Sequence, residues 1–178
     1  MKHYLLFILF CISLLHGGNL ILDQNSGIIK GTGFARTHTF PIIVDSFRVQ
    51  ITDPDSAMTR TISVVVPVSK IRTGNMLRDW NMDHFLFEPD SFQDIRFQAE
   101  TAAALKPGQD TLTGQFTINR VTRTQAIIVT LKENGTLHAV GTFQFSLTAF
   151  DLPLFGVEPL KLLDKVKISF DLTLPKSG

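Results

Sequence analysis

Alternation of apolar and polar residues runs through most of this chain and restricts its fold more than any other feature. Residues 166–174 show it most clearly, because Val166, Ile168 and the apolar residues after them are separated by polar ones such as Lys167. Successive side chains of a β-strand point to opposite faces, so a period of two predicts strands with one buried and one solvated face. The pattern recurs at residues 47–51, 62–68, 95–99, 112–118 and 141–147, with a more apolar stretch at residues 127–131.

Turn residues separate these runs and favour antiparallel pairing of neighbours. Asn134-Gly135 is the strongest hairpin signal, because both residues tolerate the positive φ angles that a tight hairpin turn requires. Further turn sequences occur at residues 53–55, 106–108 and 119–120. Many short strands at this spacing predict an all-β antiparallel sandwich or barrel. A barrel of about eight strands is favoured, because closure removes the exposed edges of a sheet.

Two segments break the alternation and predict one or two short helical insertions. Residues 69–87 place Met76, Leu77 and Trp80 at helical spacing, whereas residues 152–163 contain two prolines and a glycine, which are incompatible with a regular strand or a long helix. We expect both segments to lie over an open end of the barrel.

The N-terminus has the layout of a secretory signal peptide. A short basic start precedes an apolar run at residues 4–15, and Gly17 and Gly18 follow, near the expected cleavage site. The apolar run is shorter than the roughly 20 residues that cross a bilayer as a helix, so no membrane span is expected after its removal. The prediction is therefore a signal peptide at residues 1–18 and one barrel domain at residues 19–178, located in the periplasm or secreted. Cys11 is the sole cysteine, so this domain forms no internal disulfide.

Charge and histidine spacing argue against several classes of function. Seventeen Lys and Arg residues against sixteen Asp and Glu residues give a net charge of +1, which does not favour nucleic-acid binding. His38, His84 and His138 are too far apart for a compact metal motif, so neither metal nor cofactor is expected. Asp79, Asp83 and His84 are dense enough to consider acid and base catalysis, but a solvated helical turn accounts for them equally well. We predict that the protein is not an enzyme and has no catalytic residue.

The aromatic composition leaves two interpretations of the barrel interior. Phe occurs 15 times and Tyr once, so the aromatic positions lack a polar group and suit fully apolar surroundings. An ordinary core filled by its own side chains explains this composition. An apolar cavity explains it too, because eight-stranded barrels can hold one small ligand.

The order and spacing of several segments resemble the YceI-like family over residues 26–174. The segments that carry the resemblance are VVVPVSKIRTGN (64–75), MLRDWNMDHFLF (76–87), SFQDIRF (91–97), LTGQFTINRVTRTQAIIVTL (112–131), GTFQFSLTAFDL (141–152) and DKVKISFDLTL (164–174). The resemblance implies a lipocalin-like, periplasmic barrel that encloses an extended amphiphile, such as a polyisoprenoid or an isoprenoid quinone tail. It also implies a membrane-bound cytochrome as a candidate partner, because one is fused to some relatives. A homodimer is the other candidate assembly.

Apolar side chains of the helical segment and of the strands are the candidate ligand contacts. Flexible methionines adapt to irregular ligands, and inward-facing phenylalanines suit a lipid tail. The candidate contacts are Met76, Leu77, Trp80, Phe85, Phe87, Phe116, Phe143, Phe145 and Phe170. Asn75, Arg78 and Asp79, near the expected barrel mouth, are the candidate contacts for a polar head group.

The sequence predicts a non-catalytic, exported protein that encloses an isoprenoid or another lipid-like ligand in an apolar barrel. The alternative is a structural or partner-interaction module with a self-filled barrel, in an envelope-stress or electron-transfer context. A long dry cavity would favour the first hypothesis, and a core closed by Phe and Leu side chains would favour the second.

Overall fold

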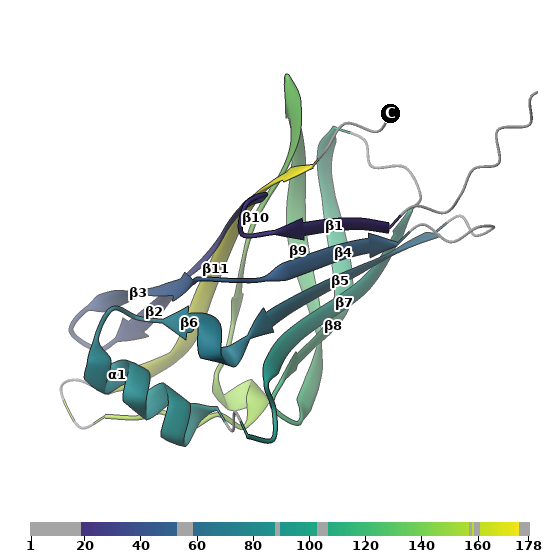
Figure 1. The fold of residues 1–178 in the computed structure, drawn as a ribbon. Helices are drawn as coiled ribbons and strands as arrows, with labels where there is room; N and C mark the ends of the chain where they lie inside the picture. The colour runs from purple at the N-terminus through teal and green to yellow at the C-terminus, as the bar shows by residue number, and fades with distance from the viewer. Residues whose placement is uncertain are drawn as a thin grey trace, which may run out of the picture.

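The alternating runs form one strongly curved antiparallel sheet (Figure 1). The computed structural model describes residues 19–52, 59–87, 90–102, 107–156, 158 and 161–174. Within these residues the strands are β1 (Asn19–Asp23), β2 (Gly27–Ala35), β3 (Thr39–Val44), β4 (Arg48–Thr52), β5 (Thr59–Pro67), β6 (Ile71–Arg72), β7 (Asp94–Ala102), β8 (Gly108–Ile118), β9 (Val121–Asn134), β10 (Thr136–Phe145) and β11 (Leu162–Leu174). Their order in the sheet is β1-β4-β5-β7-β8-β9-β10-β11-β2-β3-β6.

The predicted all-β antiparallel fold is confirmed, but the described residues form eleven strands instead of about eight. The difference arises mainly before residue 45, where β1, β2 and β3 occupy a stretch with little alternation of apolar and polar residues. Gly31 and Gly33 take inward positions of β2, so the apolar signal of that strand is weak. The two-residue β6 is separated from β5 by the helical turn η1 (Val68–Lys70).

A short backbone connection between β1 and β2 makes the sheet return on itself. β1 pairs with β4 at one edge of the sheet, whereas β2 lies eight positions away in the sheet order and pairs with β11. Only residues 24–26 connect the two strands. The Thr173 amide of β11 donates to the Ser26 carbonyl at 2.7 Å, which fixes this turn against the last strand. The sheet must therefore curl, and its concave face encloses the interior.

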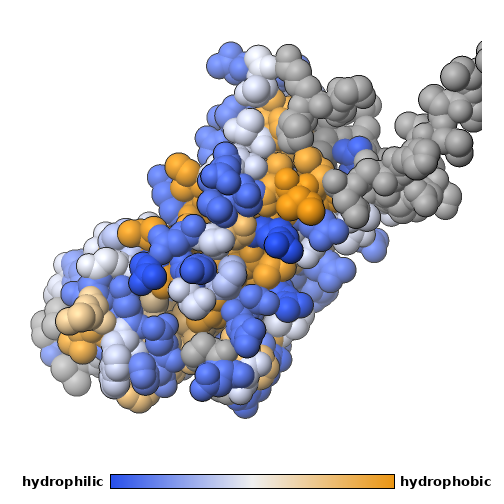
Figure 2. All heavy atoms as spheres, in the orientation of Figure 1, coloured by the Kyte–Doolittle hydropathy of each residue, from blue (hydrophilic) through white to orange (hydrophobic). Residues whose placement is uncertain are grey.

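Burial follows the alternation that the sequence predicts. On β4, Val49 and Ile51 are buried while Arg48 is exposed; on β8, Phe116 is buried while Gln115 is exposed. Hydrophilic residues cover most of the outer face in view in Figure 2, where apolar residues gather in a few patches. The apolar rows of the predicted strands thus point to the concave face.

Short helical elements gather at one end of the barrel, which we call the helical end (Figure 1). They are α1 (Met76–Asn81), the π-helical turn η2 (Met82–Leu86) and η3 (Thr148–Phe150). The Asn119 side-chain amide of the β8–β9 turn donates to the Leu86 carbonyl at 3.2 Å, and Arg123 donates to the Ala149 carbonyl at 2.9 Å. The opposite end, where β7 ends at Ala102 and β8 begins at Gly108, is called the β7–β8 end.

Several sequence predictions about local structure have clear outcomes. The helical insertion is observed at α1 and η2, and residues 152–156 contain neither helix nor strand. Asn134 and Thr136 pair across Gly135, whose φ of 76° suits the predicted hairpin turn. The predicted signal peptide at residues 1–18 and the turn at residues 53–55 lie outside the described residues. Across the ranges that the structure describes, no helix is both long and apolar enough to cross a membrane.

Asp164 at the start of β11 holds η3 in place. Its carboxylate accepts hydrogen bonds from the Thr148 hydroxyl, from the Thr148 amide at 2.8 Å and from the Ser146 hydroxyl at 2.7 Å. These bonds, the Thr148 hydroxyl above all, lower the pKa of Asp164 below its usual value. Hydrogen bonds to the charged form therefore stabilise the fold when Asp164 is ionised.

We expect Asp164→Asn to lower the thermal midpoint at neutral pH by about 1 to 3 °C, a small effect because the carboxylate is exposed. A lowered folded-state pKa gives stability above the unfolded-state pKa that is lost as pH falls through the folded-state value. The difference from wild type should therefore shrink between about pH 5 and pH 2, as measured by circular dichroism. Asp83→Asn, an exposed change on η2, is the control. A difference that stays constant down to pH 2 would contradict this role.

Phe116 packs edge-to-face against Phe143, Phe145 and Phe150, with ring centroids 5.8, 5.3 and 5.3 Å away. It is only 6% exposed. Phe116→Ala should lower the free energy of unfolding by about 3 to 4 kcal/mol, because it removes buried area and leaves a void. Ile128→Ala, at a position that is 51% exposed, should change it by less than about 0.5 kcal/mol. Urea denaturation measures both, and equal effects would show that Phe116 has no special part in the core.

Candidate ligand-binding cavity

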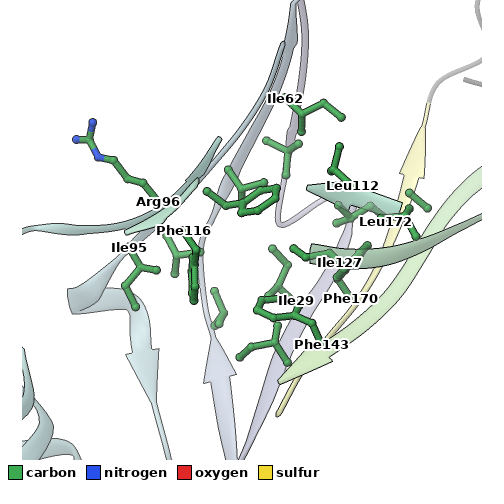
Figure 3. A pocket seen from close by; sticks show the side chains of 18 of the residues that line it. Ile29, Ile62, Ile95, Arg96, Leu112, Phe116, Ile127, Phe143, Phe170 and Leu172 are labelled. Atoms are coloured by element: carbon green, nitrogen blue, oxygen red, sulfur yellow. The ribbon is translucent and has the colours of Figure 1, made fainter. Parts of the chain in front are cut away.

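A cavity of about 510 Å³ lies inside the curved sheet (Figure 3). Every strand of the described sheet contributes apolar side chains to it, among them Leu22, Ile29, Ile42, Val49, Ile62, Ile71, Ile95, Leu112, Ile127, Phe143 and Phe170. Sites for small molecules typically have volumes of roughly 300 to 1,000 Å³ and mostly apolar walls. The interior of this barrel has the size and lining of such a site.

Glycines in the wall keep large aromatic rings out of the lumen. Gly141 on β10 pairs with Phe170 on β11, and the Phe170 ring lies where a side chain at Gly141 would be, 2.3 Å from the ideal Cβ position. Gly114 on β8 accommodates the Phe97 ring in the same way, at 2.7 Å. An aromatic ring that lies over a cross-strand glycine is part of the wall. This packing leaves space at the centre of the barrel.

Five of the sequence-predicted contacts line the cavity. Phe116, Phe143 and Phe145 form its aromatic wall toward the helical end, and Phe87 and Phe170 complete the set. The alternation of the strands identified four of them, because it places these positions on the inward face. Phe87 follows η2 and is 7% exposed.

The other four predicted contacts lie outside the cavity. Met76, Leu77, Trp80 and Phe85 are 88%, 69%, 48% and 53% exposed, and none of them belongs to the lining. The structure therefore differs from the expectation that the first turns of the helical segment line the interior.

The π-helical turn explains this difference. The Phe87 amide donates to the Met82 carbonyl five residues earlier, at 2.9 Å, so the helical phase shifts after α1. As a result Met82, Leu86 and Phe87 face the cavity, while the apolar residues of α1 remain outside. Regular helical spacing could not predict such a change of phase.

The exposed residues form an aromatic row on the outer surface of the helical end. The Trp80 ring stacks on His84 with centroids 4.4 Å apart and meets Phe85 edge-on at 5.4 Å. Phe85 in turn contacts Phe155, at 5.7 Å, in the segment after η3. This row connects α1 and η2 to the segment before β11.

The three predicted head-group residues hold α1 in place. Asn75 caps the helix by accepting from the Arg78 amide at 3.0 Å, and the Arg78 guanidinium lies 3.9 Å from the Phe40 ring centroid. Asp79 accepts from the amide and the hydroxyl of Thr73, at 2.7 and 2.6 Å. None of the three lines the cavity. Their polar groups are engaged in local structure.

The acidic residues considered for catalysis do not converge. Asp79 faces Thr73, whereas the His84 ring nitrogen Nδ1 lies 2.8 Å from the Trp80 carbonyl oxygen, with which it hydrogen-bonds. Asp83 is exposed on η2. In the part of the chain that the structure describes, no three His, Cys, Asp or Glu residues are placed to hold a metal ion.

Polar lining residues occur at the β7–β8 end, and the sequence analysis missed them. Thr101, Gln109 and Asp110 line the cavity there. Arg96 is also at its border, but its side chain points away from the other lining residues in Figure 3 and forms an ion pair with Asp94 at 2.9 Å. The sequence did contain a signal for this polar lining. Thr101 follows Phe97 and Ala99 in the alternation of β7, so it faces the same side as these two residues.

Comparisons with known proteins show which proteins share this fold. The sequence matches the YceI-like domain over residues 27–174. No curated protein sequence matches it significantly. BcnA from Burkholderia cenocepacia has a similar structure, with a TM-score of 0.70 and 20% identity over 85% of this chain and 98% of that chain.

Two further solved structures have the same fold. A polyisoprenoid binding domain from Saccharophagus degradans gives a TM-score of 0.71 and 13% identity, over 89% of this chain and 98% of that one. The YCEI protein of Campylobacter jejuni gives 0.58 and 14%, over 77% and 85%. Likeness at these identities shows a shared fold, and the sequence match covers most of the chain. This chain therefore belongs to the YceI-like domain family.

Proposed function

We propose that this protein is a non-catalytic, exported binding protein whose barrel encloses an isoprenoid or a similar lipid-like amphiphile. The observation that carries the proposal is the cavity of about 510 Å³, to which every described strand contributes apolar side chains. Each methylene group moved from water into such a site gains about 0.8 kcal/mol. A long hydrocarbon tail can therefore bind tightly without any specific polar contact. The structural likeness to a polyisoprenoid binding domain agrees with this proposal.

The size of the cavity favours a binding role over a self-filled barrel. Protein interiors are packed with few voids larger than a water molecule. The side chains of this barrel leave about 510 Å³ of apolar space unfilled, which is far more than the voids of an ordinary core. A ligand with a hydrocarbon tail can fill that space.

The chemistry of the lining favours a protein that binds its ligand over an enzyme that converts it. The cavity walls are mainly Leu, Ile, Val and Phe side chains. Asp79 and His84, the residues considered for catalysis, are engaged outside the cavity with Thr73 and Trp80. We therefore assign no catalytic residue and no cofactor.

Export fits a carrier of this kind. The predicted signal peptide at residues 1–18, with cleavage near Gly17 or Gly18, directs the protein to the periplasm or the medium. A lipid-like molecule is poorly soluble in these aqueous compartments, so a barrel that shields its tail provides a route through them.

The second candidate function is a partner-interaction module, and the exposed aromatic row of α1 and η2 favours it. Trp80 and Phe85 are about half exposed, and Met76 is 88% exposed. Large exposed apolar side chains in contact with one another are typical of interaction surfaces. A membrane-bound cytochrome and a second copy of the chain are the proposed partners. This role is compatible with ligand binding, because the row lies outside the cavity.

Filling the cavity tests the proposal. We expect wild-type protein to bind one molecule of a short-chain isoprenoid quinone per chain in isothermal titration calorimetry. Ala139→Phe places an aromatic ring in the lumen from β10 and should weaken binding about tenfold, because it displaces roughly two methylene groups of the tail.

The matched control is Thr142→Phe, on the same strand but on its exposed outer face. It should leave the dissociation constant unchanged, and thermal unfolding should show that both variants are folded. A wild-type protein that takes up neither the quinone nor a prenol would contradict the carrier role.

A further inference from the structure

Exposed apolar side chains are concentrated on the outer surface of the helical end, where α1 lies in Figure 1. Met76 and Leu77 are the most exposed large apolar residues of the described chain, and they lie one helical turn before Trp80. Trp80 meets Phe85 edge-on, and Phe85 contacts the half-buried Phe155. We call these five residues the apolar cap.

The apolar cap lies on the outside of the segments that close the cavity. Met82 and Leu86 of η2 are buried and line the cavity, whereas Phe85 between them is exposed. Leu152, after η3, is buried in the lining as well, and Phe155 follows it three residues later. A partner that contacts the apolar cap therefore lies directly against the closed end of the cavity.

The small size of the apolar cap does not suit a protein partner. Except for Phe155, its residues come from one continuous stretch, Met76–Leu86. Stable protein interfaces bury about 800 Å² and roughly 20 to 30 residues on each side. A bilayer requires no such area, because a few apolar side chains can insert between its head groups and acyl chains.

The residue types of the apolar cap also match the boundary region of a bilayer. Tryptophan is enriched at membrane–water interfaces because its large ring is apolar and its N–H group is polar. The Trp80 ring has Phe85 at one edge and stacks on the polar ring of His84, with centroids 4.4 Å apart. Trp80 is therefore placed between an apolar and a polar neighbour, as it would be in the boundary region.

The charged groups around the apolar cap balance one another. Three cations and three carboxylates belong to α1, η2, residues 155–161 and the ion-pair partner of this segment: Arg36, Arg78, Lys161, Asp79, Asp83 and Glu158. Arg36 pairs with Glu158 at 3.0 Å, so neither charge is available to attract a charged partner strongly. A surface without net charge matches zwitterionic head groups, which carry no net charge either.

We infer that the apolar cap docks the barrel onto the surface of a zwitterionic phospholipid bilayer, with Trp80 and Phe85 between the head groups and the acyl chains. Docking brings the closed end of the cavity against the membrane in which a lipid-like ligand dissolves. This purpose rests on the proposed carrier function, whereas the docking itself requires no ligand. The inference assigns the exposed aromatic residues to a lipid surface instead of a cytochrome or a second copy of the chain.

Trp80 is the sole tryptophan of the chain, so its fluorescence reports docking of the apolar cap directly. Exported wild-type protein, from which the predicted signal peptide has been removed, is titrated with phosphatidylcholine vesicles. We expect a blue shift of the Trp80 emission and quenching by phosphatidylcholine that is brominated on its acyl chains. The partition coefficient should change by less than about twofold between low and high salt, because insertion of neutral side chains is not screened.

Three variants separate the apolar cap from other exposed apolar residues. Met76→Ser and Phe85→Ser should each weaken partitioning about tenfold, because each removes one inserting side chain. Ile28→Ser is the matched control, since Ile28 is as exposed as Phe85 but lies on β2 outside the apolar cap, and it should leave partitioning unchanged. Trp80 remains the reporter in all three variants, and circular dichroism checks that they are folded.

A Trp80 emission that stays constant at every lipid concentration would overturn the inference. Equal partitioning of all three variants would overturn it too. A blue shift that grows with protein concentration in the absence of vesicles, together with a dimer mass in sedimentation, would show that a second copy covers the apolar cap instead. Wild-type protein that docks on vesicles but takes up no isoprenoid quinone would contradict the carrier function and leave the docking intact.

Discussion

The structure depends on the removal of one apolar sheet face from water without a second layer to cover it. Inward-facing residues such as Val49, Ile51, Phe116 and Ile118 are buried, although the described residues contain only one sheet and a few short helical elements. A single sheet can bury one whole face only by curling around it. The three-residue link between β1 and β2 enforces that curl, because it joins strands that are far apart in the sheet order. The cavity is a direct consequence, since a wide curled sheet encloses more space than its side chains fill.

Small and large side chains are paired so that this space stays open. The rings of Phe170 and Phe97 lie over Gly141 and Gly114, and thus thicken the wall without crossing the lumen. The helical end is closed differently, by η2, by η3 and by the aromatic contacts of Phe116 with Phe145 and Phe150. In the proposed carrier, stability and binding are linked, because the apolar walls that bury the chain's hydrophobic residues are also the proposed binding surface. A bound ligand would act as a part of the core.

Much of the fold and part of the cavity could be predicted from the sequence, because successive side chains of a strand point to opposite faces. Every second residue of a strand therefore faces the same side. That rule correctly placed Phe116, Phe143, Phe145 and Phe170 on the inward face. It failed for β2, where Gly31 and Gly33 replace apolar residues in the inward row. It also could not place the residues of α1 and η2, because a π-helical turn changes which side chains face inward. The polar lining at the β7–β8 end was missed for a third reason: the neighbours of Thr101 depend on the register of β5 and β7, which sequence patterns do not specify.

The central claim is that the cavity holds a lipid-like molecule in the native protein. Native mass spectrometry of the protein purified from its own host, followed by solvent extraction and lipid analysis, tests this claim most directly. The account predicts one long-chain isoprenoid or similar amphiphile per chain. A ligand-free mass, together with no uptake of added isoprenoid quinone, would contradict it and leave the partner-interaction module as the better explanation.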